Sequence, residues 1–270
     1  LVKSEAGCRK EVSATLKAFQ GLGGIITAPQ EVCEEGTVVF KGATQLPGQP
    51  SYSWIFEDGS RSNQQNPPAR IYNQPGSFLV RMVVDNNGCS DTRAHQLEVR
   101  AKPVLQLSQK DLTVCRGTPV SLTVSGASSY AWSPAAGLNT TTGPQVSVSP
   151  QANTRYLVTG TNAYNCSSRD SVEVRVVNPF NLQVNSELSV CEGQSVQLSA
   201  TGAESYSWIN QTGGLSSTSS SNPQARPTAT TTYTVVGTGE AACFSDTANI
   251  TVRVLALPTI DAGPDAELQP

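Results

Sequence analysis

The sequence predicts an all-β fold made of tandem β-sandwich repeats, and three observations lead to that prediction. Ser, Thr, Val, Gly and Pro dominate the 270 residues, a composition that favours strands and turns over helices. Several landmarks recur with a period close to 77 residues. Within each period, short stretches alternate apolar with polar residues between turn-forming residues, as the strands of a sandwich do.

The period is carried by three kinds of residue. Each of three tryptophans ends a Ser-Tyr-x-Trp tetrapeptide, with separations of 78 and 76 residues, and a cysteine and a tyrosine later in the period recur at 77. Because the Tyr and Trp of the tetrapeptide are two apart on a strand, they share a face, and we expect a buried aromatic pair. The predicted core residues are Trp54, Trp132, Trp208, Tyr156 and Tyr233.

The repeats suggest the following boundaries. Residues 1–20 resemble the last strands of a preceding repeat, full units follow at 21–101, 102–178 and 179–256, and residues 257–270 open another. The linkers at Lys102-Pro103, Asn178-Pro179 and Leu257-Pro258 are short and contain proline. Such linkers favour an extended, semi-rigid array.

The seven cysteines alternate between two local contexts. The first context is Val-Cys followed shortly by Gly, and it holds Cys33, Cys115 and Cys191. The second precedes the last strand of a unit, and it holds Cys8, Cys89, Cys166 and Cys243. Because Cys8 belongs to the second context, we expect its partner upstream of Leu1. Paired cysteines also predict a location outside the cytoplasm.

Two pairing schemes fit the spacing. The preferred scheme staples each unit internally, through Cys33–Cys89, Cys115–Cys166 and Cys191–Cys243, and so stabilises units of fewer than about 80 residues. The rival scheme joins Cys8–Cys33, Cys89–Cys115 and Cys166–Cys191 across linkers. A strand and a linker that run on in one direction would hold these sulfurs far apart. A linker that folds back sharply would bring these sulfurs together and make the rival pairing scheme possible.

Composition and motifs argue against an enzyme. Charged residues make up 14% of the chain and the net charge is -3, so no basic face for nucleic acid or anionic lipid is indicated, and no apolar run is long enough for a membrane span. The single histidine, His95, is predicted to face solvent on a strand, and nucleophile, phosphate-loop and zinc motifs are absent. We predict no cofactor and no metal. The acidic turns at Glu57-Asp58, Asp85-Asn86-Asn87 and Asp261–Asp265 are read as turn formers, with calcium as the alternative.

Residues 51–59, Ser-Tyr-Ser-Trp-Ile-Phe-Glu-Asp-Gly, resemble the aromatic-x-Phe-Gly-Asp-Gly motif of PKD domains, which have an immunoglobulin-like fold. Glu57 stands where that family usually has glycine. The next two units resemble related Ig-like repeats of Bacteroidetes cell-surface proteins, through Val-Cys-x-Gly-x-x-Val-x-Leu at Val114–Leu122 and Val190–Leu198. The resemblance implies tandem PKD-type and Ig-like sandwiches in a gliding-adhesin-like protein exported by the type IX secretion system. It also implies O-glycosylation at Asp-Ser/Thr-aliphatic sites, for which Ser171 and Thr247 qualify.

These observations lead to a functional hypothesis of a non-enzymatic, extracellular stalk or fibre segment of a large surface protein. Its expected partners are neighbouring repeats, with surface glycans or further copies of itself as further candidates. One alternative is a module that binds glycan or protein through loops such as Thr212–Pro223 and Ala135–Gly143, although these loops contain no aromatic residue. Another is an accessory region of a secreted hydrolase. Sandwich edges of a fibre could also pair by strand addition.

Overall fold

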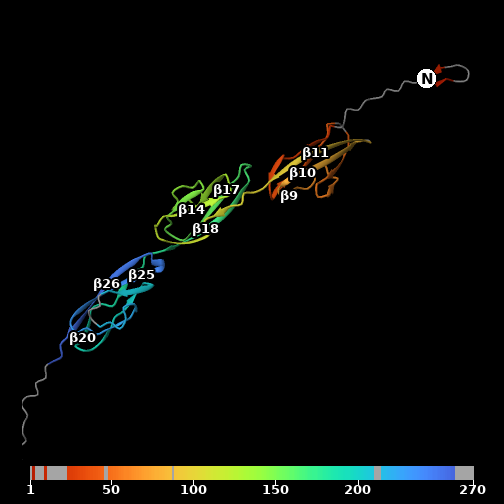
Figure 1. Ribbon diagram of the computed structural model, residues 1–270. Coiled ribbons are helices and arrows are strands. Elements are labelled where there is room, and N and C mark those ends of the chain that lie inside the picture. Colours follow the sequence, from red (N-terminus) through yellow and green to blue (C-terminus); the bar gives the residue numbers. More distant parts are fainter. Residues whose placement is uncertain are drawn as a thin grey trace, which may run out of the picture. The chain divides into compact units, whose positions relative to one another are not determined.

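The computed structural model describes residues 2–3, 9–10, 23–45, 48–86, 88–209 and 214–258. Within these ranges the secondary structure is strands apart from one three-residue 3-10 helix, which confirms the all-β prediction. The strands group into three immunoglobulin-like sandwiches, called here the first, second and third repeats (Figure 1). A short antiparallel pair, β1 (Val2–Lys3) and β2 (Arg9–Lys10), precedes them. The predicted strand around Val12, Ala14 and Leu16 lies outside the described residues.

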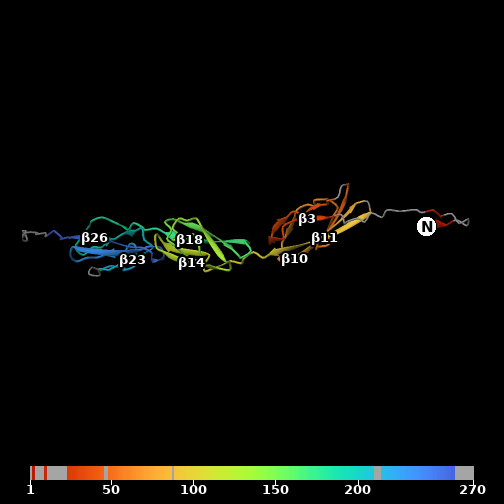
Figure 2. The ribbon, with the colours of Figure 1, turned by 90° about the horizontal axis from the view of Figure 1, so that it is seen from above.

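The first repeat has one large sheet in the order β4-β11-β10-β7-β8 and two small sheets, β3-β6 and β5-β9. Its centre is the long antiparallel hairpin of β10 and β11 (Figure 2). Gly42 on β6 is required by close approach, because a Cβ there would lie 2.8 Å from the Met82 sulfur and 3.1 Å from the Trp54 ring. The strands are β3 (Ile25–Thr27), β4 (Glu31–Cys33), β5 (Gly36–Val38), β6 (Lys41–Ala43), β7 (Ser51–Ile55), β8 (Arg61–Ser62), β9 (Arg70–Tyr72), β10 (Gly76–Asn86) and β11 (Cys89–Arg100).

The second repeat pairs a sheet in the order β13-β18-β17-β15 with a sheet in the order β12-β14-β16. Alternation of exposed and buried residues along β14 and β15 follows the apolar pattern of the sequence. The strands are β12 (Gln106–Leu107), β13 (Asp111–Cys115), β14 (Val120–Ser125), β15 (Ser129–Ser133), β16 (Gln145–Val148), β17 (Thr154–Thr161) and β18 (Ser167–Val177).

The third repeat repeats the plan, with a sheet in the order β20-β26-β25-β23 and two small sheets, β19-β22 and β21-β24. The 3-10 helix η1 (Glu240–Ala242) lies between β25 and β26. The strands are β19 (Gln183–Val184), β20 (Leu188–Cys191), β21 (Val196–Gln197), β22 (Ala200–Thr201), β23 (Ser205–Trp208), β24 (Gln224–Ala225), β25 (Thr231–Thr238) and β26 (Ser245–Leu255).

The three tryptophans and two tyrosines expected in the core are at most 3% exposed. Of the tetrapeptide tyrosines, Tyr52 and Tyr130 are buried, whereas Tyr206 is half-buried. The same device satisfies each buried indole. Its Nε1 donates to a backbone carbonyl 10 to 12 residues later, from Trp54 to Gln64, from Trp132 to Gly143 and from Trp208 to Ser220, at 2.9–3.0 Å. Burial therefore costs these side chains no unpaired donor.

Contacts between Cα atoms divide the chain into two compact units, and the division passes through the second repeat. One unit contains residues 1–104 together with residues 126–128 and 160–168 of the second repeat, and the other contains 105–125, 129–159 and 169–270. The turn between β17 and β18 thus belongs with the first repeat. Each unit contains one junction between consecutive repeats.

Candidate functional site: disulfide-bonded junctions between repeats

In every repeat, the first-context cysteine ends a short strand that runs parallel to the last strand. Cys33 on β4 pairs with Arg100 on β11, Cys115 on β13 pairs with Val177 on β18, and Cys191 on β20 pairs with Leu255 on β26. The partner is the final residue of the last strand in each case. The first-context cysteine therefore lies where the chain leaves its repeat.

Second-context cysteines lie at the opposite end of the same strand. Cys89 is the first residue of β11, Cys166 directly precedes β18, and Cys243 lies two residues before β26. These strands have 12, 11 and 11 residues, so at about 3.3 Å per residue each spans about 35 Å. The two cysteines of one repeat are therefore much too far apart to bond, because a disulfide requires Cα atoms within about 7 Å.

The structure instead bonds each exit end to the next repeat. Cys33 is bonded to Cys166 and Cys115 to Cys243, with Cα–Cα distances of 5.5 and 5.1 Å. The internal pairings Cys33–Cys89, Cys115–Cys166 and Cys191–Cys243 are thus wrong, and the rival pairings are wrong as well. The two sequence contexts of cysteine correspond to two distinct positions in each repeat. The parallel direction of the strand that carries the first-context cysteine was not predicted, because apolar alternation is the same for parallel and antiparallel neighbours.

Of the remaining cysteines, Cys89 is half-buried and Cys191 is exposed, and neither forms a disulfide in the described part of the chain. Cys89 packs against the core of the first repeat. Cys8, with its proposed upstream partner, lies outside the described residues.

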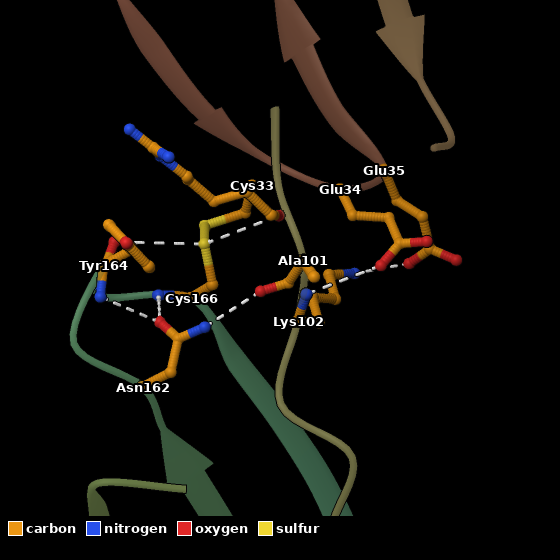
Figure 3. The surroundings of a disulfide bond; sticks show 9 residues. Cys33, Glu34, Glu35, Ala101, Lys102, Asn162, Tyr164 and Cys166 are labelled. Carbon is orange, nitrogen blue, oxygen red and sulfur yellow. Dashed lines mark hydrogen bonds and ion pairs between the residues drawn. A yellow bond between two sulfur atoms is a disulfide. The ribbon is translucent and has the colours of Figure 1, made fainter. Parts of the chain in front are cut away.

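At the first junction, which joins the first and second repeats, Asn162 organises the loop that carries Cys166 (Figure 3). Its Oδ1 accepts hydrogen bonds from the backbone N–H groups of Tyr164 and Cys166, at 3.0 and 3.1 Å. Its Nδ2 donates to the carbonyl of Ala101 in the linker, at 2.9 Å. A single amide side chain therefore shapes the loop and attaches it to the exit of the preceding repeat.

Arg100 adds a contact of another kind to this junction. Its guanidinium carbon lies 4.5 Å from the centroid of the Tyr164 ring, and an Nη donates to Glu31 on β4 at 2.5 Å. The hydrogen bond that Arg100 donates to Glu31, more than any other factor, raises the pKa of Arg100. The guanidinium that lies over the Tyr164 ring is therefore a permanent cation.

The linker of the first junction is anchored by the acidic residues after Cys33. The backbone N–H of Lys102 donates to Glu34 at 3.4 Å, and its ammonium group forms an ion pair with Glu35 (Figure 3). The hydrogen bond from Lys102 lowers the pKa of the Glu35 carboxyl below its ordinary value. Lys102 is therefore oriented from both its backbone and its side chain.

The second junction, between the second and third repeats, uses different chemistry around the same bond. Arg175 on β18 donates to both carboxylate oxygens of Glu240 in η1, one of them at 2.9 Å. Phe180, the second residue of the third repeat, packs beside the linker and against Gly239, where a Cβ would lie 2.8 Å from the ring. These residues and Val177 line a groove at the junction. The second junction thus contains a bidentate ion pair and a packed aromatic ring. The first junction contains a stacked arginine and a bridging asparagine instead.

Several other predicted residues have assignable environments. His95 is half-buried and not solvent-facing, because its ring lies edge-on to Phe40 and its Nε2 is 2.9 Å from the Pro29 carbonyl oxygen. Asp58 accepts hydrogen bonds from the backbone and hydroxyl of Ser60, which lower the pKa of its carboxyl, and it also pairs with Arg70. Glu57-Asp58 is accordingly a hydrogen-bonded turn.

The two candidate glycosylation residues differ in access. Thr247 is exposed, whereas Ser171 is half-buried and its hydroxyl accepts a hydrogen bond from Arg155 at 3.0 Å. In both, the preceding aspartate accepts the backbone N–H of the Ser or Thr at 2.8 Å. Both remain predictions, with Thr247 the more accessible acceptor.

In the described ranges, no cluster of three or more His, Cys, Asp or Glu side chains could hold a metal ion. No helix among the described residues is both long and apolar enough to cross a membrane. Asp261 and Asp265 lie outside these ranges.

The PKD domain family matches residues 24–101. No curated protein matches the chain significantly. Similar solved structures include titin domains I67–I69 (13% identity, 86% of this chain and 99% of that chain, TM-score 0.40), the three N-terminal domains of the Hoc capsid protein of bacteriophage RB49 (13%, 86% and 99%, 0.42) and the insect immune protein hemolin (12%, 86% and 100%, 0.34).

The PKD domain family thus matches the first repeat, and the described residues form tandem Ig-like sandwiches. The second and third repeats share the sheet plan of the first. Disulfide-bonded domains of this kind indicate an extracellular protein.

Proposed function

We propose that this chain is a non-enzymatic, tension-bearing segment of an extracellular stalk or fibre, whose disulfides carry load from one repeat to the next. The observation that supports this proposal is that both disulfides cross a junction and that they interlock. Cys115 lies between Cys33 and Cys166 in the sequence, and its partner Cys243 lies beyond them. The covalent loops of 133 and 128 residues therefore overlap.

Interlocked loops suit a mechanical role because force bypasses most of the first and third sandwiches. Tension applied at the chain ends enters at Cys33 and crosses directly to Cys166 through the sulfur atoms. From Cys166 the shortest covalent path runs back along the second sandwich to Cys115 and crosses to Cys243. The first and third sandwiches would therefore release little length if they opened under load, because most of their residues lie outside this path. Disulfides within each repeat would protect single domains but would leave every linker as the only connection.

The finer assignments belong to the same proposal. A bacterial cell surface, export by the type IX system and a part in gliding or adhesion are supported by the sequence resemblance, and PKD/Ig-like repeats are typical adhesive or structural modules. We propose the boundaries 21–101, 102–178 and 179–256 for the repeats, and neighbouring repeats as the principal partners.

Single-molecule force spectroscopy on the chain tests the load-bearing role. We expect the oxidised protein to release less than half the contour length that it releases after reduction, because residues 34–114 and 167–242 lie outside the shortest covalent path. The control is the variant Cys166→Ser/Cys243→Ser, which should release the full length in both conditions. Full release from the oxidised wild-type protein would contradict the proposal. Specific retention of the oxidised protein on a glycan array would favour a binding module instead.

A further inference from the structure

The exit end of the third repeat has the same geometry as the two bonded exits. Cys191 ends β20 opposite Leu255, as Cys33 ends β4 opposite Arg100 and Cys115 ends β13 opposite Val177. A turn with a left-handed residue follows each cysteine, at Glu35, Gly117 and Gly193. Both equivalent cysteines are bonded to the repeat that follows them, whereas Cys191 is exposed and unbonded within the described ranges.

The surface beside Cys191 is exposed, whereas the equivalent surfaces beside Cys33 and Cys115 are in contact with the repeat that follows. At the first junction the Arg100 side chain lies on the Tyr164 ring of the second repeat. At the second junction Val177 is 6% exposed and lines the groove with Phe180 and Glu240. Leu255, the equivalent residue, is 52% exposed, and Leu257 beyond it is 61% exposed. Two exposed leucines and an exposed thiol therefore lie where the other repeats contact their successors.

We propose that Cys191, Leu255 and Leu257 form a docking end for one further repeat of the same kind, which supplies the cysteine that precedes its own last strand. The occupant is inferred from continuity with the two established junctions, because in both of them the bonded cysteine comes from the turn before β18 or β26. At the spacing of those bonds, the partner of Cys191 lies beyond Pro270. This inference goes beyond the proposed function and does not depend on it.

Formation of the Cys191 disulfide needs a two-electron oxidant. The oxidant is a disulfide that reacts by thiol–disulfide exchange. The Cys191 thiolate attacks that disulfide, forms a mixed disulfide and releases one thiolate of the oxidant. The thiolate of the incoming cysteine then attacks the Cys191 sulfur, and the second thiolate of the oxidant leaves. Two protein thiols are oxidised to one disulfide, and the oxidant is reduced to two thiols.

An extended chain tests the proposal directly. Residues 1–258 would be followed by a second copy of residues 181–258, so that Leu257 is kept and three residues separate Leu255 from the added repeat, as three separate Val177 from Asn181. After refolding in glutathione and glutathione disulfide, we expect non-reducing peptide mapping to find Cys191 bonded to the Cys243 of the second copy, alongside the two existing disulfides. The matched control carries Cys243→Ser in the second copy only, and its Cys191 should be alkylated quantitatively.

The leucines are tested by the rate of this bond. Leu255→Asp with Leu257→Asp should slow formation of the Cys191 disulfide about 10-fold, since docking would lose apolar burial. Leu79→Asp, at a residue that is 37% exposed on β10, is the matched control and should leave the rate unchanged. An equal rate in all three proteins would remove the leucines from the docking end.

Peptide mapping of protein from its native source provides the second measurement, which does not depend on folding of the added copy. A peptide that joins Cys191 to a second-context cysteine of a further repeat supports the proposal. A free Cys191 thiol, or a bond from Cys191 to Cys89 or Cys8, overturns it. The proposal is also overturned if Cys115 bonds to the Cys243 of the first copy in the extended chain while Cys191 is alkylated as a free thiol.

Discussion

The two junctions share a covalent bond and almost nothing else. The first holds its cysteine loop through the three hydrogen bonds of Asn162 and through Arg100 stacked on Tyr164. The second relies on Arg175 paired with Glu240 and on Phe180 packed at Gly239. Strand pairing positions the first-context cysteine identically in both, so the surrounding contacts are free to differ. The disulfide is the repeated element, and the contacts are particular to each pair of repeats.

Removal of either disulfide is expected to have the largest effect. The double variants Cys33→Ser/Cys166→Ser and Cys115→Ser/Cys243→Ser should each lower the free energy of unfolding by up to about 5 kcal/mol on the chain-entropy account. Because the two loops have similar lengths, the two losses should be similar. Chemical denaturation followed by tryptophan fluorescence measures them. A loss confined to one variant would show that the contacts, and not the covalent loops, dominate.

The contacts should separate the junctions by salt dependence. Tyr164→Ala should make Cys33–Cys166 about 2- to 5-fold easier to reduce by removing the cation–π contact, with little change between low and high salt. Glu240→Gln should ease reduction of Cys115–Cys243 at low salt, and the effect should fade near about 1 M salt because exposed charges are screened. Glutathione titration with peptide mapping gives both values. The same salt response in both variants would contradict the prediction that the two junctions differ in the kind of contact that stabilises them.

The turns that carry the bonded cysteines should respond differently to glycine. Asn165 in the first junction and Ala242 in the second both have left-handed φ angles, of 61° and 54°. Asparagine tolerates this region and alanine does not, so Ala242→Gly should stabilise the protein by about 0.5–1 kcal/mol. Asn165→Gly should change stability less. Thermal unfolding compares the two variants, and destabilisation by Ala242→Gly would show that its φ angle is not left-handed in solution.

Acid should produce the smallest effect that we predict at the first junction. Lys102 lowers the pKa of Glu35 in the folded protein, so the contribution of this pair is present above the ordinary glutamate pKa and is lost as the pH falls through the lowered value. NMR titration of the Glu35 carboxyl should give a midpoint below that of a free glutamate. Lys102→Ala should return the midpoint to the ordinary range. A midpoint that the variant leaves unchanged would assign the shift to another cause.

The aromatic residues that recur in the repeats could be predicted from local pattern, whereas Phe40, Phe56 and Tyr72 of the first core were not predicted. The Ser-Tyr-x-Trp tetrapeptides and the later tyrosines identify the recurring buried residues, because a period of two assigns each side chain to one face of a strand. His95 shows where that reasoning ends. Its half-buried position depends on the Pro29 carbonyl, which belongs to a loop distant in sequence.

The sequence by itself determined the all-β class, the 77-residue repeat, the recurring aromatic residues of the core and the two contexts of cysteine. Only the tertiary structure decided which cysteines meet. That outcome depends on β4, β13 and β20 running parallel to the last strand of their repeats. Parallel pairing places the first cysteine at the exit of a repeat, about 35 Å from the second cysteine of that repeat and next to the entrance of the following one. Apolar alternation is the same for parallel and antiparallel strands, so the sequence pattern does not show which cysteines meet at the junctions.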